Sequence, residues 1–371
     1  MRNKVKKRLL FNPGPTNVSE EVREVLKSVG DVCHREKEFR DVLDRIRSKI
    51  LKVVNGEGTH TAVAFTASAT GCNEAIINSV HGKILLINNG KFSKELGEIA
   101  KKYNIPVTEL KFDPFKQIDL EKIENCLKQV PEITHILMVH HETETGMIIP
   151  LHEIGQLARK YNKILIADTV SSFGGLKIDA KADNLDFCSV SANKCLESFP
   201  GVSFVIAKKS ELEKLKGKSR NYYFDLYANW ESEERKSETP FTPAVQPFFA
   251  LDKALNLLLE EGPENRIKRY ERNAARMRKG LKKLGFKFVL PDSTQSNILT
   301  AIWIPKGLDY WELHDRLKER GYTIYSGKST LDQGIFRIAT LGAIGEGDID
   351  SFLKCLKEVL GEMKFEPESQ K

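Results

Sequence analysis

The chain has 371 residues with a formal net charge of +7, and 29% of them are charged, so its length fits one very large domain or two of ordinary size. Hydrophobic residues make up 40%, and the 25 glycines and 14 prolines are scattered, which excludes disordered, collagenous and mucin-like proteins. The longest nearly apolar stretches, residues 84–87 and 298–304 among them, are far shorter than the roughly 18 residues that a membrane span needs, so we expect no membrane association.

The first 20 residues are expected to form an N-terminal arm. They begin with the basic stretch MRNKVKKRLL, which lacks the hydrophobic region of a secretory signal. The NPGPT sequence after it favours an extended backbone that needs a surface to lie on, which favours a homodimer. The six cysteines form no CxxC pair, a pattern that favours reduced thiols and a cytoplasmic location. The eight histidines show no metal-ligand spacing, so we expect no metal site.

A large domain is expected over residues 21–260. Short apolar runs alternate there with turn residues and helical periods, which is the rhythm of βα units. Because the runs are mostly continuous, they predict strands covered on both faces, and hence a mostly parallel sheet between helices. The predicted strands are residues 62–65, 84–88, 135–139, 164–167, 187–190 and 202–207. The fold class is therefore α/β.

A smaller C-terminal α+β domain is expected over residues 261–371. Pro263 opens a helix with apolar residues on one face, and strands are predicted near residues 298–303 and 335–338. Asp348 is predicted to cap a closing amphipathic helix. The helix after Pro263 carries nine Lys and Arg residues within positions 266–283. We interpret them as a solvated face, because no aromatic residues interleave with them as in a nucleic-acid reader.

Polar residues follow the predicted strands, at the sheet edge where ligands bind in open α/β folds. After Phe65 the sequence TASATG leads into a helix, and small residues with free N–H groups at a helix N-terminus make a phosphate cup. An ordinary helix N-cap with a capping-box glutamate is the commoner explanation of such a stretch. Residues 326–330 end like a phosphate-binding P-loop, but Tyr322 stands where its first glycine belongs, so nucleotide binding is not expected.

Asp168 and Lys194 stand at the ends of two successive predicted strands. Taken alone, such an acid often caps the next helix, and most lysines lie in solvent. Together with the cup and an aromatic residue, Phe92, they are the groups that hold pyridoxal 5′-phosphate: a Schiff-base amine, a partner for the pyridinium nitrogen, a phosphate anchor and a ring stack. A sugar-phosphate or nucleic-acid binder would leave the Asp168 and Lys194 pairing unexplained, so no nucleic-acid partner is expected.

Seven motifs extend this interpretation over nearly the whole chain: FNPGPTNVSEEVREVL, ASATG, NNGKF, HHETETG, ADTVSSFGG, SANKCLESFPG and FRIATLG. In this order they resemble the class V aminotransferases of fold-type I. The resemblance implies a pyridoxal-phosphate-dependent transferase fold, an amino donor and a 2-oxo acid as substrates, and a homodimer with shared active sites. It makes Lys194 the Schiff-base lysine and Asp168 the partner of the pyridine nitrogen.

The resemblance also assigns the other residues of the site. Those expected to bind the cofactor are Ser68, Ala69, Thr70, Phe92, Thr143, Val170, Asn193 and, from the other subunit, Thr242. Arg337 matches the arginine that holds the acid group of the substrate. The chain departs from the family pattern at Ala69 and Ser93, where glycine is common, and at residues 221–223, which replace smaller side chains.

Several stretches, MVHHETETGMIIPL and GKSRNYYFDLYANW among them, are closer to the family members that move an amino group from an aminophosphonate to pyruvate. We expect this reaction. A phosphonate has three acceptor oxygens and more negative charge than a carboxylate, so we expect a second cation beside Arg337. Arg35 and Arg220 are the candidates, and both fit surface ion pairs equally well. The alternative is a serine or alanine aminotransferase acting with glyoxylate or pyruvate, whose relatives usually have glutamine at the position of Asn193.

Overall fold

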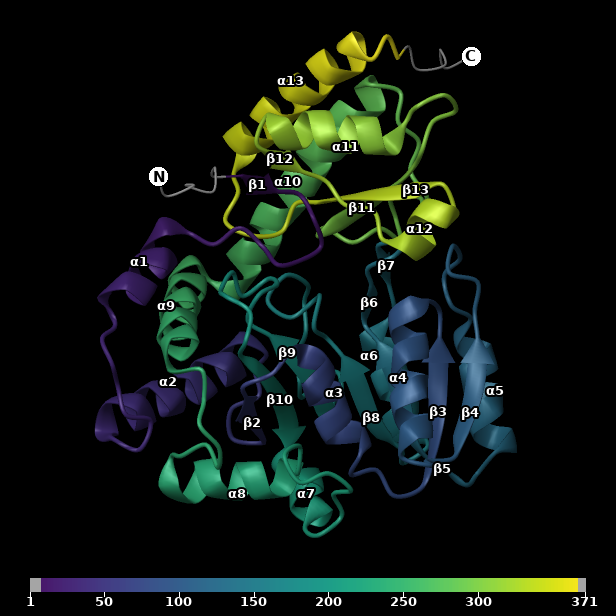
Figure 1. Cartoon of the computed structure of the whole chain (residues 1–371). Helices are drawn as coiled ribbons and strands as arrows, with labels where there is room; N and C mark the ends of the chain where they lie inside the picture. Colours follow the sequence, from purple (N-terminus) through teal and green to yellow (C-terminus); the bar gives the residue numbers. More distant parts are fainter. Residues whose placement is uncertain (1–7, 366–371) are drawn as a thin grey trace.

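The computed structural model describes residues 8–365 and places a seven-stranded sheet at the centre of the chain (Figure 1). The strand order is β2-β10-β9-β8-β5-β3-β4, and neighbours are parallel except that β10 is antiparallel to β2 and β9. The strands are β2 His60–Phe65, β3 Lys83–Asn88, β4 Val107–Lys111, β5 Ile133–Val139, β8 Ile164–Asp168, β9 Phe187–Ser191 and β10 Ser203–Lys208. The prediction of a mostly parallel α/β sheet is confirmed.

Alternation of side chains along the strands divides the core into two layers. Val63, Leu86 and Leu137 face one side of the sheet and belong to the cluster with α3 (Ala69–Ile77) and α4 (Lys91–Lys102). Their neighbours within each strand face the other side of the sheet. The helices that cover that side are α2 Lys37–Val53, α5 Leu120–Gln129, α6 Leu151–Lys160 and α9 Val245–Glu261. Burial on both faces explains why the strands are continuously apolar.

Shorter elements complete this part of the chain. They are α1 Glu20–Ser28, the hairpin strands β6 His141–Glu142 and β7 Met147–Ile148, α7 Lys209–Leu212, the 3₁₀ turn at Glu213–Leu215 and α8 Leu226–Lys236. No helix within residues 8–365 is both long and apolar enough to cross a bilayer.

The C-terminal part of the chain packs around a hydrophobic cluster of its own. Its elements are α10 Pro263–Lys283, β11 Leu299–Trp303, α11 Tyr310–Glu319, β12 Tyr322–Thr323, α12 Lys328–Asp332, β13 Ile335–Ala339 and α13 Glu346–Glu362. Strands β11 and β13 pair antiparallel, so the helices and strands predicted for this part are confirmed. The division into an arm (1–20), a large domain (21–260) and a small domain (261–371) stays a prediction.

The described part of the N-terminal arm, residues 8–20, lies on its own chain, and residues 1–7 of the predicted arm lie outside the described residues. Strand β1 (Leu9–Leu10) pairs in parallel with β12, and Phe11 is fully buried in the C-terminal cluster. Figure 1 shows this purple segment beside the green and yellow elements of the C-terminal part. The arm therefore finds its surface within one chain, and the part of the dimer argument that rested on it is wrong.

Two predictions about the C-terminal helices are wrong. The N-cap of α13 is Gly345, and Asp348 accepts a hydrogen bond from its N–H (2.9 Å) from inside the first turn. The basic face of α10 is not wholly solvated either, because Arg266 is only 2% exposed. Arg266 forms ion pairs with Glu197 (3.3 Å) and Glu261, so it ties α10 to the segment after β9.

Candidate active site

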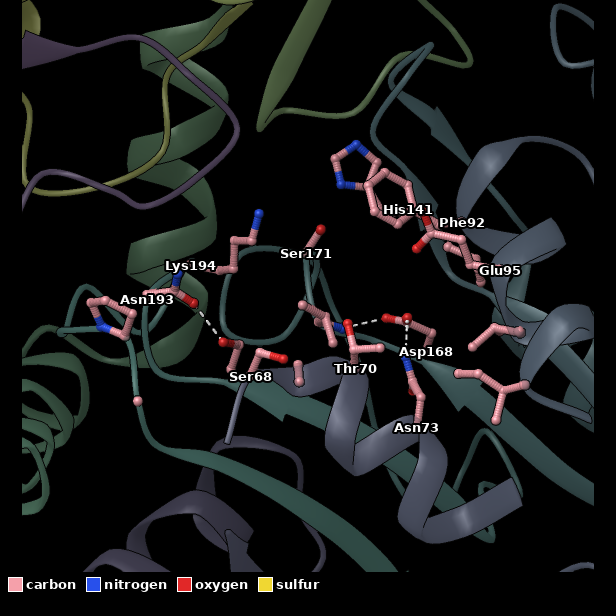
Figure 2. A pocket seen from close by; sticks show the side chains of 18 residues that line it. Ser68, Thr70, Asn73, Phe92, Glu95, His141, Asp168, Ser171, Asn193 and Lys194 are labelled. Atoms are coloured by element: carbon pink, nitrogen blue, oxygen red, sulfur yellow. Dashed lines mark hydrogen bonds between the residues drawn. The ribbon is translucent and has the colours of Figure 1, made fainter. Parts of the chain in front are cut away.

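A cavity of about 290 Å³ lies where β5, β8 and β9 end and α3 and α4 begin (Figure 2). Its wall contains most of the predicted cofactor residues: Ser68, Ala69, Thr70, Phe92, Asp168, Val170, Asn193 and Lys194. The carboxyl ends of parallel strands bring them together from distant parts of the chain, as expected for this fold class. Five other predicted site residues do not line this cavity: Arg35, Thr143, Arg220, Thr242 and Arg337.

The start of α3 supplies a possible anion site. Ser68 is the N-cap residue, but its side chain makes no capping hydrogen bond. Glu74 accepts a hydrogen bond from the hydroxyl of Tyr103 instead, so the capping-box explanation is wrong. The Ser68 hydroxyl and the first N–H groups of the helix are therefore available to an anion, whose charge the helix dipole favours.

Asp168 ends β8 and presents its carboxylate to the cavity. Oδ1 accepts a hydrogen bond from the N–H of Val170 (2.9 Å). Oδ2 accepts one from the amide of Asn73 (2.7 Å), which Figure 2 shows below Asp168. Burial raises the pKa of Asp168, and both hydrogen bonds, together with the charge of Lys194, oppose that rise. The chain continues into turns rather than a helix, so the helix-cap explanation is wrong.

Lys194 follows β9 by three residues, and its side chain reaches the N-terminal arm. Its Nζ donates a hydrogen bond to the carbonyl of Pro13 (2.5 Å). A Cβ on Gly14 would lie 2.5 Å from the Nζ of Lys194. Burial lowers the pKa of Lys194, the charge of Asp168 opposes this and the charge of Arg337 adds to it. An amine with a lowered pKa is unprotonated in a larger fraction of molecules near neutral pH, and only the unprotonated form can act as a nucleophile or accept a proton.

Arg337 lies on β13 beside the cavity and is 4% exposed. Its Nη1 donates a hydrogen bond to the carbonyl of Thr143 (2.8 Å), and the guanidinium lies 4.8 Å from the ring centroid of Tyr325. Its Nε has no hydrogen-bond partner among residues 8–365. Burial lowers the pKa of Arg337, but an arginine stays charged in proteins. A buried cation with an unused donor is well suited to an anionic ligand.

Arg220 lies at the far end of α3. Its Nη1 donates hydrogen bonds to the carbonyls of Asn78 (2.7 Å) and Val80 (2.8 Å), just after the last turn of the helix. The nine residues of α3 separate that end from the cup by about 13 Å. Within one chain the guanidinium of Arg220 is used on the carbonyls that end α3, and its contact with the substrate stays a prediction.

Arg35 holds the segment that carries Thr242. Its Nη1 donates hydrogen bonds to the carboxylate of Glu238 and the carbonyl of Thr239, both at 2.9 Å, and its contact with the substrate stays a prediction. Thr242 is exposed. Its contact with the cofactor of a second subunit stays a prediction.

The sequence did not single out two further residues of the cavity wall. Asn73 faces Asp168 because one turn of α3 brings its amide level with the end of β8. His141 is 2% exposed, and burial lowers its pKa to about 3, so its imidazole is neutral. The His-His pair after β5 is visible in the sequence, but which histidine faces the cavity depends on the turn into β6.

The chain matches the family model "Aminotransferase class-V" over residues 8–343. It belongs to the class V aminotransferases. This class V chain is 36% identical to a 2-aminoethylphosphonate–pyruvate transaminase of Bacillus cytotoxicus, over 94% of its own length and 97% of the relative. It is also 36% identical to a bifunctional phosphonoacetaldehyde hydrolase/aminoethylphosphonate transaminase of Clostridioides difficile, over 95% of its own length, and spans 56% of that longer relative.

Solved structures of class V aminotransferases have the same fold. An alanine–glyoxylate aminotransferase from Nostoc sp. superposes with a TM-score of 0.90, at 26% identity and 97% coverage of both chains. The fold is thus that of fold-type I enzymes, and the protein is an aminotransferase that takes an amino donor and a keto acid.

Class V aminotransferases use pyridoxal 5′-phosphate, and the cavity fits this cofactor chemically. A helix start with unused N–H groups, a buried carboxylate, an amine with a lowered pKa and an aromatic ring surround one space. These groups suit the phosphate, the ring nitrogen, the aldehyde and the ring face of the cofactor.

Proposed function

We propose that this aminotransferase moves the amino group of 2-aminoethylphosphonate to pyruvate, giving phosphonoacetaldehyde and L-alanine. The observation that carries the proposal is the 36% identity, over nearly the whole chain, to relatives named for this reaction. The structural neighbour named for alanine and glyoxylate is 26% identical. Sequence similarity therefore favours a phosphonate donor over alanine or serine.

The cavity residues are assigned to the cofactor as follows. The start of α3 would hold the phosphate group, and Asp168 would face the ring nitrogen. Lys194 would bind the aldehyde carbon through Nζ. The other residues proposed to contact the cofactor are Ser68, Ala69, Thr70, Phe92, Thr143, Val170 and Asn193, with Thr242 of a second subunit.

Two side chains carry the proton chemistry of the proposal. When bound, pyridoxal phosphate supplies a conjugated ring that accepts the electron pair left by a departing C–H proton. The charged form of Asp168, which the hydrogen bonds from Val170 and Asn73 stabilise, would favour the protonated form of the ring nitrogen. The pKa of Lys194 is lowered by burial. Its Nζ would remove the proton from the donor carbon as a base and then, as an acid, deliver it to the C4′ carbon of the cofactor.

Arg337 is proposed to hold the acid group of both substrates in turn. The amino donor carries a phosphonate and pyruvate carries a carboxylate, and a guanidinium binds either through parallel N–H bonds. The unpartnered Nε supports this proposal. Arg35 and Arg220 stay the candidates for a second cation at the phosphonate, although their guanidinium groups are engaged within one chain.

We further propose a homodimer with shared active sites. Thr242 is exposed, and next to it Phe241 contacts the ring of Tyr222, which is 87% exposed, at 5.8 Å between centroids. An exposed aromatic side chain such as Tyr222 suits a subunit contact. Sedimentation of the holoenzyme at assay concentration tests this, and an active monomer contradicts it.

A panel of amino donors tests the proposed reaction. The values of kcat/KM for 2-aminoethylphosphonate, L-serine and L-alanine are measured with pyruvate and again with glyoxylate. We expect 2-aminoethylphosphonate with pyruvate to lead by more than about tenfold, which is about 1.4 kcal/mol of barrier. If serine or alanine leads instead, the phosphonate proposal is wrong and the enzyme is a serine or alanine aminotransferase.

A further inference from the structure

Glu142 is a fully buried carboxyl group that the proposed reaction does not use. It lies in β6, and its two oxygens accept hydrogen bonds from backbone N–H groups: Oε2 from Phe92 and Oε1 from Glu144, both at 3.0 Å. Burial raises the pKa of Glu142 to about 7, and the two hydrogen bonds oppose the rise. A carboxyl group kept in such a position needs an explanation, because burying it costs free energy.

The carboxylate of Glu142 completes the start of α4. The N-cap residue of that helix is Gly90, which has no side chain, and the hydroxyl of Ser93 accepts the hydrogen bond from the Gly90 N–H (3.1 Å). The N–H of Phe92 depends on Glu142 instead. A Cβ on Gly90 would lie 2.5 Å from Oε2, so the carboxylate rests directly on the helix backbone. The helix dipole favours an anion at this place.

The segment around Glu142 also contacts two other residues of the site. The N–H of His140 donates a hydrogen bond to the carbonyl of Asp168 (2.9 Å), and the carbonyl of Thr143 accepts one from Arg337 (2.8 Å). Residues 140–143 therefore make contact, one after another, with β8, with the start of α4 and with β13. Glu142 supplies the contact with α4.

We propose that Glu142 is a positioning residue, which fixes Phe92 relative to Arg337 by joining the start of α4 to β6. It acts through Phe92 and does not itself line the cavity. This inference rests on the proposed functions of Phe92 as the ring stack and Arg337 as the anion ligand. A ring stack and an anion ligand must keep their separation, because a misplacement of about 1 Å costs about 100-fold in rate.

The Glu142→Gln variant tests the proposal with little change in shape. Glutamine keeps one acceptor oxygen and turns the other into an N–H₂ group that faces a backbone N–H. We expect kcat/KM for 2-aminoethylphosphonate to fall about 100-fold, and the visible circular dichroism of the bound cofactor to change. The matched control is Glu233→Gln. Glu233 lies on α8, is also fully buried, and accepts a hydrogen bond from the backbone N–H of Ala64. It should leave both readouts close to those of the wild type.

A double-mutant cycle separates positioning from a general loss of stability. If Glu142 acts through Phe92, the losses in Glu142→Gln and Phe92→Leu are less than additive in the double variant. Additive losses, a wild-type kcat/KM in Glu142→Gln, or an equal loss in Glu233→Gln overturns the proposal. If the wild-type holoenzyme uses no donor of the panel, the proposed function fails. The dichroism then still tests Glu142, because it needs no substrate.

The Gly90→Ala variant tests the same contact from the side of α4. It is used if Glu142→Gln yields no folded holoenzyme. The added Cβ displaces the carboxylate of Glu142 from the start of α4, although Glu142 itself is not substituted. The same change in dichroism and the same loss of kcat/KM support the proposal, and wild-type values of both overturn it.

Discussion

Replacing Asp168 with asparagine removes a negative charge from the cavity and preserves the shape of the side chain. Asp168 accepts hydrogen bonds from Val170 (2.9 Å) and Asn73 (2.7 Å), whereas asparagine has only one acceptor oxygen. The amide of Asn73 can turn to present its own oxygen, so both contacts can persist. We therefore expect the free energy of unfolding to change by about 1 kcal/mol or less.

The rate should fall far more than the stability. The carboxylate of Asp168 is proposed to face a protonated ring nitrogen, and two opposite charges about 4 Å apart attract each other by about 4 kcal/mol at an effective dielectric constant near 20. Loss of that attraction corresponds to about a thousandfold in kcat. In the wild type, hydrogen bonds oppose the rise in the pKa of Asp168 that burial causes. In the variant the same hydrogen bonds cannot replace the lost attraction, because asparagine carries no charge.

Single-turnover rates and urea unfolding, measured side by side, test this expectation. Asn73→Ala is the matched control, because it removes one hydrogen bond to Asp168 and keeps the charge. It should cost roughly 1.5 kcal/mol, or about tenfold in rate. The reasoning is refuted if Asp168→Asn unfolds, or if its rate lies within about tenfold of the wild type.

Three further predictions follow from the site and the core. Lys194→Ala should lose the visible absorbance of bound cofactor and nearly all turnover, and borohydride reduction with peptide mapping should label Lys194; a label on another lysine contradicts the assignment. Gly14→Ala places a Cβ 2.5 Å from the Nζ of Lys194 at a φ of +136°, so kcat should fall at least about tenfold with the circular dichroism of the backbone unchanged. Burial raises the pKa of Glu233 from 4.5 to about 8, so the folded state binds this proton more tightly than the unfolded state does. The free energy of unfolding of the wild type should therefore fall as the pH rises from 4.5 to about 8, by at most about 5 kcal/mol. Urea unfolding of Glu233→Gln should show a shallower loss, and an equal slope in both proteins would count against this pKa.

The central sheet could be predicted from the sequence because its inner strands are continuous apolar runs. The edge strand β4 could not, since three residues of its sequence VTELK are polar and none is fully buried, and alternation over five residues is a weak signal. The hairpin strands β6 and β7 have two residues each and are set by their contacts rather than by a local period.

The centre of the site could also be predicted, because Asp168 and Lys194 follow strands whose ends converge. Arginines were harder to interpret. Arg220 donates to carbonyls at the end of α3, and Arg266 pairs with the carboxylates of Glu197 and Glu261. Nothing in the local sequence distinguishes these partners from a substrate or from solvent. Long, flexible side chains take their direction from tertiary contacts.

The pairing of β1 with β12 has a consequence for the order in which the enzyme is assembled. The arm that contacts Lys194 is made before the strand that it pairs with and before the rest of the cluster that buries Phe11. Long-range contacts of this kind form late. A growing chain therefore contains all the strands of its central sheet before it contains the partners of the arm, so the contact between the arm and Lys194 can be held in place only after β12 and the C-terminal cluster have been made.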